Sequence, residues 1–151
     1  MNFLGHSYLC IGNEHLIAGN LAGDSYKGNL DKIAHLPKNI QDGVKLHRFI
    51  DDFTDHSNLI VEVGHLFQAN GITKVGYIAS DILLDHYLAK NWNLFSDIEY
   101  TKFIQTIYTE TDKNLIYLEK DFCFLYDKMK DYKWFSEYPD EKGIEKILWQ
   151  F

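Results

Sequence analysis

The sequence is poor in cysteine and proline, and it contains no long apolar run. Its two cysteines, Cys10 and Cys123, lie in no CxxC motif, so they are expected to be reduced thiols of a cytoplasmic protein. No segment approaches the roughly 20 apolar residues that span a bilayer, and the N-terminal segment lacks a basic leader. We therefore expect neither membrane insertion nor secretion.

Positive charge is also scarce, since the chain has 15 Lys and Arg against 22 Asp and Glu. The resulting net charge of -7 argues against nucleic acid, which is bound by general neutralisation of its phosphates. An anionic substrate must therefore be held by local cations. The candidates are Lys27, Lys38, Lys45, Lys90 and Arg48, the last being the chain's single arginine.

The spacing of the apolar residues predicts an all-α protein with one domain, residues 1–151. Its length of 151 residues suits one ordinary domain, and apolar residues recur at three- and four-residue spacing without strand-like alternation. Helices are expected over about 13–26, from Pro37 onward, over 58–68 and over 72–92, and from a cap at Asp97. After residue 119 we expect short helical pieces and a last helix.

A group of polar residues interrupts the second of these helices, in the segment KLHRFIDDFTDHSN at 45–58. Positions four apart lie on nearly the same face of an α-helix. His47, Asp51 and Asp55 stand in that relation. Taken alone, the segment also fits a solvated helix face.

Three other segments carry acids or histidines beside apolar or small residues. SDILLDHYLAKNW places Asp81, Asp85 and His86 within an apolar run, where acids are costly to bury without a partner. Asp24 follows small residues in GNLAGDSYKG, and His6 lies in NFLGHSYL. Imidazole nitrogens and carboxylate oxygens are ligands of Mn, Fe or Zn, so the four segments together suggest a metal site between helices.

Each of these residues also has a structural interpretation. His6 fits a hydrogen-bonded core histidine, and Asp81 fits a surface charge. Asp24 fits a buried acid paired with Lys27 or Arg48. The aromatic residues from 122 to 138 are interpreted as core packing rather than as a ligand groove.

Four blocks of the sequence resemble the acyl carrier protein phosphodiesterases, a family related to the HD-domain metal-dependent phosphohydrolases. The blocks are MNFLGH at 1–6, GNLAGDSYKG at 19–28, GVKLHRFIDDFTD at 43–55 and DILLDHYLAKNW at 81–92. The resemblance implies an HD-like helical bundle with a divalent metal, most readily Mn(II), with Mg(II), Fe(II) or Zn(II) as alternatives. The polar positions of the motif fall on His6, Asp24, His47, Asp51, Asp85 and His86.

The resemblance also implies a reaction and a protein substrate. The reaction is hydrolysis of the phosphodiester between 4'-phosphopantetheine and a serine of holo-acyl carrier protein. Asp24, Asp55 and Asp81 are the carboxylates expected to take part in catalysis. Arg48, together with Lys27, is expected to offset charge on the phosphoryl oxygens, while Lys38, Lys45 and Lys90 would receive the acidic carrier protein.

The sequence departs from the family pattern at three places. Gly5 stands where members often have Ala, and His56 begins a His-Ser-Asn sequence where they have Ser-His-Pro. Members usually continue through a further helical segment beyond the position of Phe151, so we expect this chain to lack it and to cover the exposed core as a homodimer.

Other functions remain open on the sequence alone. One is an HD-like phosphohydrolase acting on a nucleotide or another small phosphoester. Another is a non-catalytic helical module that binds carrier protein or pantetheine, and a third is a purely structural helical bundle.

Overall fold

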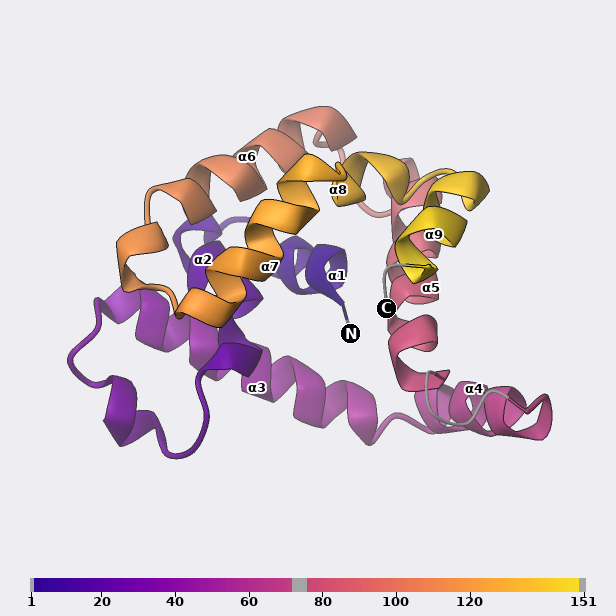
Figure 1. Ribbon diagram of the computed structural model, residues 1–151, viewed down its shortest axis with the longest axis horizontal. Helices are drawn as coiled ribbons and strands as arrows, with labels where there is room; N and C mark the ends of the chain where they lie inside the picture. The colour runs from indigo at the N-terminus through magenta and orange to yellow at the C-terminus, as the bar shows by residue number, and fades with distance from the viewer. Residues whose placement is uncertain (1, 72–75, 150–151) are drawn as a thin grey trace.

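The computed structural model describes residues 2–71 and 76–149, and within these ranges the regular structure is entirely helical (Figure 1). The α-helices are α1 (Phe3–Tyr8), α2 (Ile17–Leu21), α3 (Lys38–Asp55), α4 (Asn58–Ala69), α5 (Gly76–Lys90), α6 (Tyr100–Asp112), α7 (Lys120–Asp131), α8 (Trp134–Glu137) and α9 (Glu141–Leu148). The 3-10 helices are η1 (Glu14–Leu16), η2 (Gly23–Ser25), η3 (Leu30–Ile33), η4 (Trp92–Leu94) and η5 (Leu115–Tyr117). The all-α fold is confirmed, and the HD-like architecture stays a prediction. None of the described helices is both long and apolar enough to cross a membrane.

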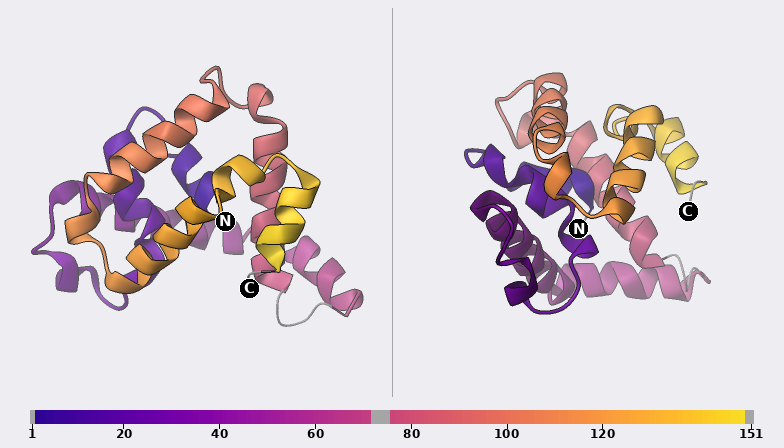
Figure 2. Two further views of the ribbon diagram at one scale, coloured as in Figure 1. Left: turned by 45° about the horizontal axis from the view of Figure 1, so that its top comes forward. Right: turned by 60° about the vertical axis from the view of Figure 1, so that its left-hand side comes forward.

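Helix α1 lies in the middle of the molecule, although it comes first in the chain (Figure 1). Four of its six residues, 4–7, are buried. In the view of Figure 1, α3 runs below it, α6 lies above it and α7 runs obliquely beside it, while α5 and α9 pack side by side at one end (Figure 2). Core side chains come from every α-helix except α4, which has no buried residue.

Helices α2 and α3 cross at glycine, which brings their backbones close together. A Cβ atom on Gly43 of α3 would lie 2.5 Å from the carbonyl oxygen of Leu16 and 2.8 Å from Cα of Gly19. The predicted helix over 13–26 is confirmed only in part, because η1, α2 and η2 divide it into three short pieces. Backbone contact with α3, rather than an apolar stripe, governs this region.

The longer helices agree with the sequence analysis more closely. Helix α3 follows Pro37 directly, and α4 covers nearly the predicted range. Helix α5 lies within the predicted 72–92 range, although its expected start falls outside the described residues. The predicted cap at Asp97 is wrong, since α6 begins at Tyr100 after Glu99. The residues before it are held in a turn, where the indole N–H of Trp92 donates to the carbonyl of Ile98.

Candidate metal centre

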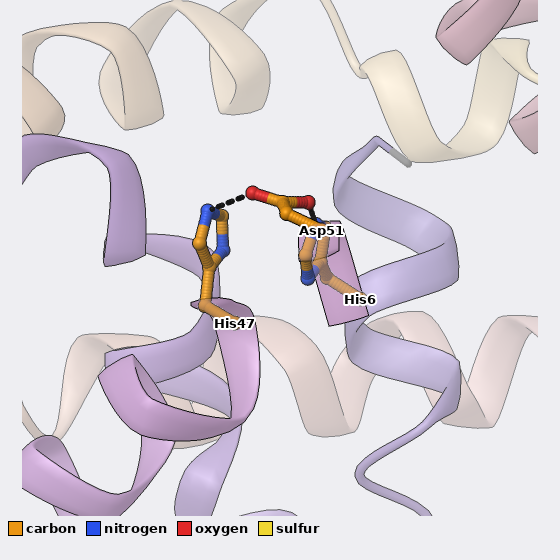
Figure 3. Close-up of side chains that lie close together, drawn as sticks. All are labelled: His6, His47 and Asp51. Carbon is orange, nitrogen blue, oxygen red and sulfur yellow. Dashed lines mark hydrogen bonds and ion pairs between the residues drawn. The ribbon is translucent and has the colours of Figure 1, made fainter. Parts of the chain in front are cut away.

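Helices α1 and α3 bring two histidines and one carboxylate together (Figure 3). His47 and Asp51 lie one turn apart on α3 and face His6 of α1. Nε2 of His6 is 3.1 Å from Oδ1 of Asp51, and Nε2 of His47 is 3.0 Å from Oδ2 of the same residue. The two imidazole rings stack with their centroids 4.2 Å apart. Both histidines are buried, while Asp51 is half-buried.

The buried residue Asn20 of α2 contacts both imidazole rings at Nδ1, the ring nitrogen that points away from Asp51. Its side-chain Oδ1 lies 2.9 Å from Nδ1 of His6, and its main-chain carbonyl oxygen lies 2.7 Å from Nδ1 of His47. Its Nδ2 donates to the carbonyl of His6 and to Sγ of Cys10, which fixes the orientation of the amide. Each Nδ1 must therefore donate its proton to an oxygen. In the neutral imidazoles this leaves the lone pair on Nε2, directed toward Asp51.

The absence of a side chain at Gly23 makes room for the His47 ring. A Cβ atom there would lie 2.1 Å from Cγ of His47, which is closer than any real contact. The next residue, Asp24, is exposed, and its Oδ1 lies 3.4 Å from Nε2 of His47. The segment GNLAGD thus supplies both an anchor behind the histidines and a carboxylate in front of one of them.

The electrostatics of the site favour negative carboxylates and a basic His47. Burial lowers the pKa of His47, but the carboxylates of Asp24 and Asp51 outweigh burial and raise it to about 9. Burial raises the pKa of Asp51, but the two histidines outweigh it and hold that pKa well below its usual range. His47 likewise lowers the pKa of Asp24. The negative carboxylates therefore stabilise a positively charged group placed between them.

The donor atoms fit a divalent metal ion. One atom each from His6, His47 and Asp51 lies within 4.8 Å of the others. Nε2 of His47 is buried, and within residues 2–71 and 76–149 it forms no hydrogen bond of acceptable geometry. A buried ring nitrogen of this kind, with its other nitrogen anchored on an oxygen, is the arrangement found in metal-bound histidines. Three protein ligands with room for a further one are typical of catalytic metal sites.

A cavity of about 400 Å³ opens beside His47 and Asp51. It is also lined by two of the predicted substrate-binding cations, Lys27 and Arg48. The guanidinium of Arg48 donates from Nη2 to the carbonyl of Tyr26 at 2.8 Å, which ties it to the cavity wall. The cavity therefore combines the candidate metal ligands with two groups that can bind an anion.

Asp85 and His86, two of the predicted ligands, have other partners in the structure. Asp85 of α5 is fully buried, and its two carboxylate oxygens accept hydrogen bonds from the backbone N–H groups of Leu4 and Gly5. Nδ1 of His86 lies 2.6 Å from the carbonyl oxygen of Tyr138. Neither residue belongs to the metal-binding group found within the described residues. Asp85 instead anchors the start of α1, and so helps to place His6.

The two remaining candidate carboxylates, Asp55 and Asp81, line a second cavity of about 440 Å³ between α3, α4 and α5. Burial raises the pKa of Asp81. The other predicted cations lie on the surface in ion pairs. Lys38 and Lys45 both contact Asp42, and Nζ of Lys90 lies 2.9 Å from Oε1 of Glu141.

Asn20 is a residue of the site that was not predicted from the sequence. The one signal for it in the sequence is an asparagine placed among small and apolar residues. Such a residue is often buried, and a buried amide requires hydrogen-bond partners. The helix around His6 was not predicted either, because six residues are too few to show an apolar period.

The chain resembles known proteins along its whole length. The family model described as "Acyl carrier protein phosphodiesterase" matches residues 1–151. A protein named acyl carrier protein phosphodiesterase from Photorhabdus laumondii is 30% identical over 149 residues, which are 98% of this chain and 74% of that protein. Proteins of the same name from Salmonella agona and Salmonella newport are each 29% identical over 149 residues, 98% of this chain and 76% of theirs. No solved structure matches the chain significantly.

Proposed function

Because this chain belongs to the acyl carrier protein phosphodiesterase family, a family of hydrolases, we propose that it removes the prosthetic group of holo-acyl carrier protein. The bond hydrolysed is the phosphodiester between 4'-phosphopantetheine and a serine of the carrier protein. Water supplies a hydroxyl group to phosphorus and a proton to the serine oxygen, giving apo-protein and 4'-phosphopantetheine. The observation that carries the proposal is that His6, His47 and Asp51 lie together beside a cavity whose lining includes Lys27 and Arg48.

We propose further that His6, His47 and Asp51 hold a divalent cation, most readily Mn(II). Two imidazole nitrogens and a carboxylate suit Mn, Fe or Zn. Such an ion supplies Lewis acidity, which polarises a phosphoryl oxygen and makes a nearby water more acidic. Asn20 keeps both Nε2 atoms available for the ion, because it accepts the Nδ1 protons.

Asp24, Lys27 and Arg48 contribute to the same reaction from the cavity wall. Asp24 lies beside His47 with its pKa lowered, so at neutral pH it is a carboxylate that can orient a water molecule rather than a proton donor. Arg48 is held by the carbonyl of Tyr26, and with Lys27 it offsets negative charge on the phosphoryl oxygens.

The carrier protein would dock on a basic segment beside this cavity. Residues 25–50 carry five cationic side chains and only two acidic ones, although the whole chain is negative. The cations are Lys27, Lys32, Lys38, Lys45 and Arg48. Carrier proteins are typically acidic, so this segment complements the substrate and would steer it toward the cavity.

The test is to incubate the purified protein with holo-acyl carrier protein and Mn(II) and to measure the intact mass of the carrier protein. We expect the mass of phosphopantetheine to be lost, and we expect a chelator to stop the loss until Mn(II) is restored. His47→Ala and Asp51→Ala should be inactive, whereas His15→Ala, which alters an exposed histidine outside the site, should be active. An unchanged carrier-protein mass with Mn(II) bound would reject the proposal in favour of another phosphoester substrate.

A further inference from the structure

The cavity between α3, α4 and α5 lies next to the candidate metal centre but has no role in it. Its volume of about 440 Å³ falls within the range of about 300 to 1,000 Å³ that is usual for small-molecule sites. The lining residues are Asp55, Ile60, Val61, His65, Ser80 and Asp81. Three helices therefore line one cavity that is partly open to solvent.

The position of this cavity relates it to the proposed phosphate site. Asp55 lies one helical turn beyond Asp51 on α3, a rise of about 6 Å along the helix axis. The cavity of Lys27 and Arg48 contains Asp51 itself, while Asp55 borders only the other one. The two cavities thus follow one another along α3, with the candidate metal centre at the first of them.

The lining of the second cavity combines apolar and polar groups. Ile60 and Val61 of α4 provide an apolar wall, while the carboxylates of Asp55 and Asp81 and the hydroxyl of Ser80 provide oxygen atoms that can accept hydrogen bonds from amide and hydroxyl groups. The imidazole of His65 adds a further polar group. An uncharged chain that has methyl groups as well as amides and a hydroxyl would match such a lining, because each part of it would meet a complementary surface.

Helix α4 itself is poorly explained by core packing. It contributes no buried side chain, and it leaves Leu59 and Leu66 72% and 65% exposed. In Figure 1 it extends from the end of α3 at the edge of the molecule. Because α4 adds no buried side chain to the core, its contribution to the cavity wall is a more specific feature of this helix than core packing.

We infer that this cavity binds the pantetheine arm of the substrate, an inference that rests on the proposed function. In the substrate the arm is bonded directly to the phosphate, so a site for it must begin beside the group that holds the phosphate. The arm carries a dimethyl group, a hydroxyl, two amides and a thiol, and it has no charge. The first cavity, which is lined by Lys27 and Arg48, then binds the phosphate and the adjoining serine of the acidic carrier protein.

The test measures binding of free pantetheine, which lacks the phosphate, by calorimetry. Val61→Trp would fill the cavity and should weaken binding by about tenfold or more. Leu59→Trp on the same helix is the matched control, since Leu59 does not line the cavity, and it should bind as the unmodified protein does. Equal affinity in Val61→Trp, or no binding by the unmodified protein, would overturn the inference.

Two further measurements separate this inference from the proposed function and from misfolding. For cleavage of holo-acyl carrier protein, Val61→Trp should raise KM, while cleavage of bis(p-nitrophenyl) phosphate, which has no arm, should be unchanged. In the unmodified protein, NMR should show contacts between the pantetheine methyl groups and the methyls of Ile60 and Val61, and their absence would contradict the site. Failure of the unmodified protein to cleave the holo-protein while it binds pantetheine would reject only the proposed function.

Discussion

Asn20 connects the two histidines of the candidate metal centre through a single buried side chain and its own carbonyl. It accepts the Nδ1 proton of His6 with its amide and that of His47 with its backbone. Partners of this kind set the tautomer and the orientation of a metal-binding ring. One residue therefore determines which nitrogen both histidines direct toward Asp51.

We predict that Asn20→Ala weakens Mn(II) binding by about 10- to 100-fold. The substitution removes the oxygen that accepts from His6 and the N–H that donates to the His6 carbonyl, so the His6 ring loses its fixed orientation. Calorimetric titration with Mn(II) measures the effect, with Asn29→Ala, an exposed asparagine, as control. Circular dichroism must show a folded variant, and an unchanged dissociation constant would show that the amide does not position the ligand.

At the scale of elements, the position of α1 depends on α5. The carboxylate of Asp85 receives the N–H groups of Leu4 and Gly5, at the first turn of α1. These N–H groups have no partner within a helix, and a negative charge near them is favourable. Helix α1 is thereby fixed at the end that precedes His6.

We predict that Asp85 makes stability depend on pH. Burial raises the pKa of Asp85 from 3.8 to about 7, although the two backbone N–H groups oppose the shift. An acid with a raised pKa in the folded state favours folding when protonated, so its contribution is greatest below pH 3.8 and is lost as the pH rises through about 7. The side chain in the Asp85→Asn variant does not titrate. The variant loses one of the two hydrogen bonds from the backbone N–H groups, and this loss changes the free energy of unfolding by the same amount at every pH.

The measurement is urea unfolding of both proteins between pH 4.5 and 8. The stability of the unmodified protein relative to Asp85→Asn should fall by a few kcal/mol, on the order expected for a fully buried carboxyl group. A difference that stays constant over this range would mean that Asp85 has an ordinary pKa in the fold.

The helices that the sequence predicted well are those whose apolar side chains form a regular stripe. Helices α3 and α6 belong to this group, and the spacing of His47 and Asp51 on α3 was visible for the same reason. The short pieces around Asn20 were missed because glycine contacts between backbones leave no periodic pattern. The role of Asp85 could not be predicted from the sequence either, since its partners are backbone groups some 80 residues away.

At the scale of the whole molecule, charge is distributed unevenly. The chain has a net charge of -7, yet residues 25–50 are net positive, and two of their five cations, Lys27 and Arg48, line the first cavity. An acidic substrate is repelled by most of the surface and attracted to this part, which favours productive encounters. The predicted homodimer stays a prediction, and a monomeric mass in light scattering would contradict it.

We predict that removing one cation of this segment impairs capture of the carrier protein but not the chemistry. Lys45→Ala should raise KM for holo-acyl carrier protein several-fold with little change in kcat, and added salt should reduce the difference from the unmodified protein because it screens exposed charges. Lys142→Ala, at an exposed position on α9, is the control. A fall in kcat with KM unchanged would assign Lys45 to a later step.

The burial of α1 also has a consequence for biosynthesis. His6 is among the first residues that a ribosome makes, but the carboxylate that anchors its helix is made about 80 residues later. At roughly 5 to 20 residues per second, the growing chain waits about 4 to 16 s for that partner. Helix α2, which also packs against α1, is made well before α5, so the N-terminal segment can pack early but is anchored at its start only after α5 has been synthesised.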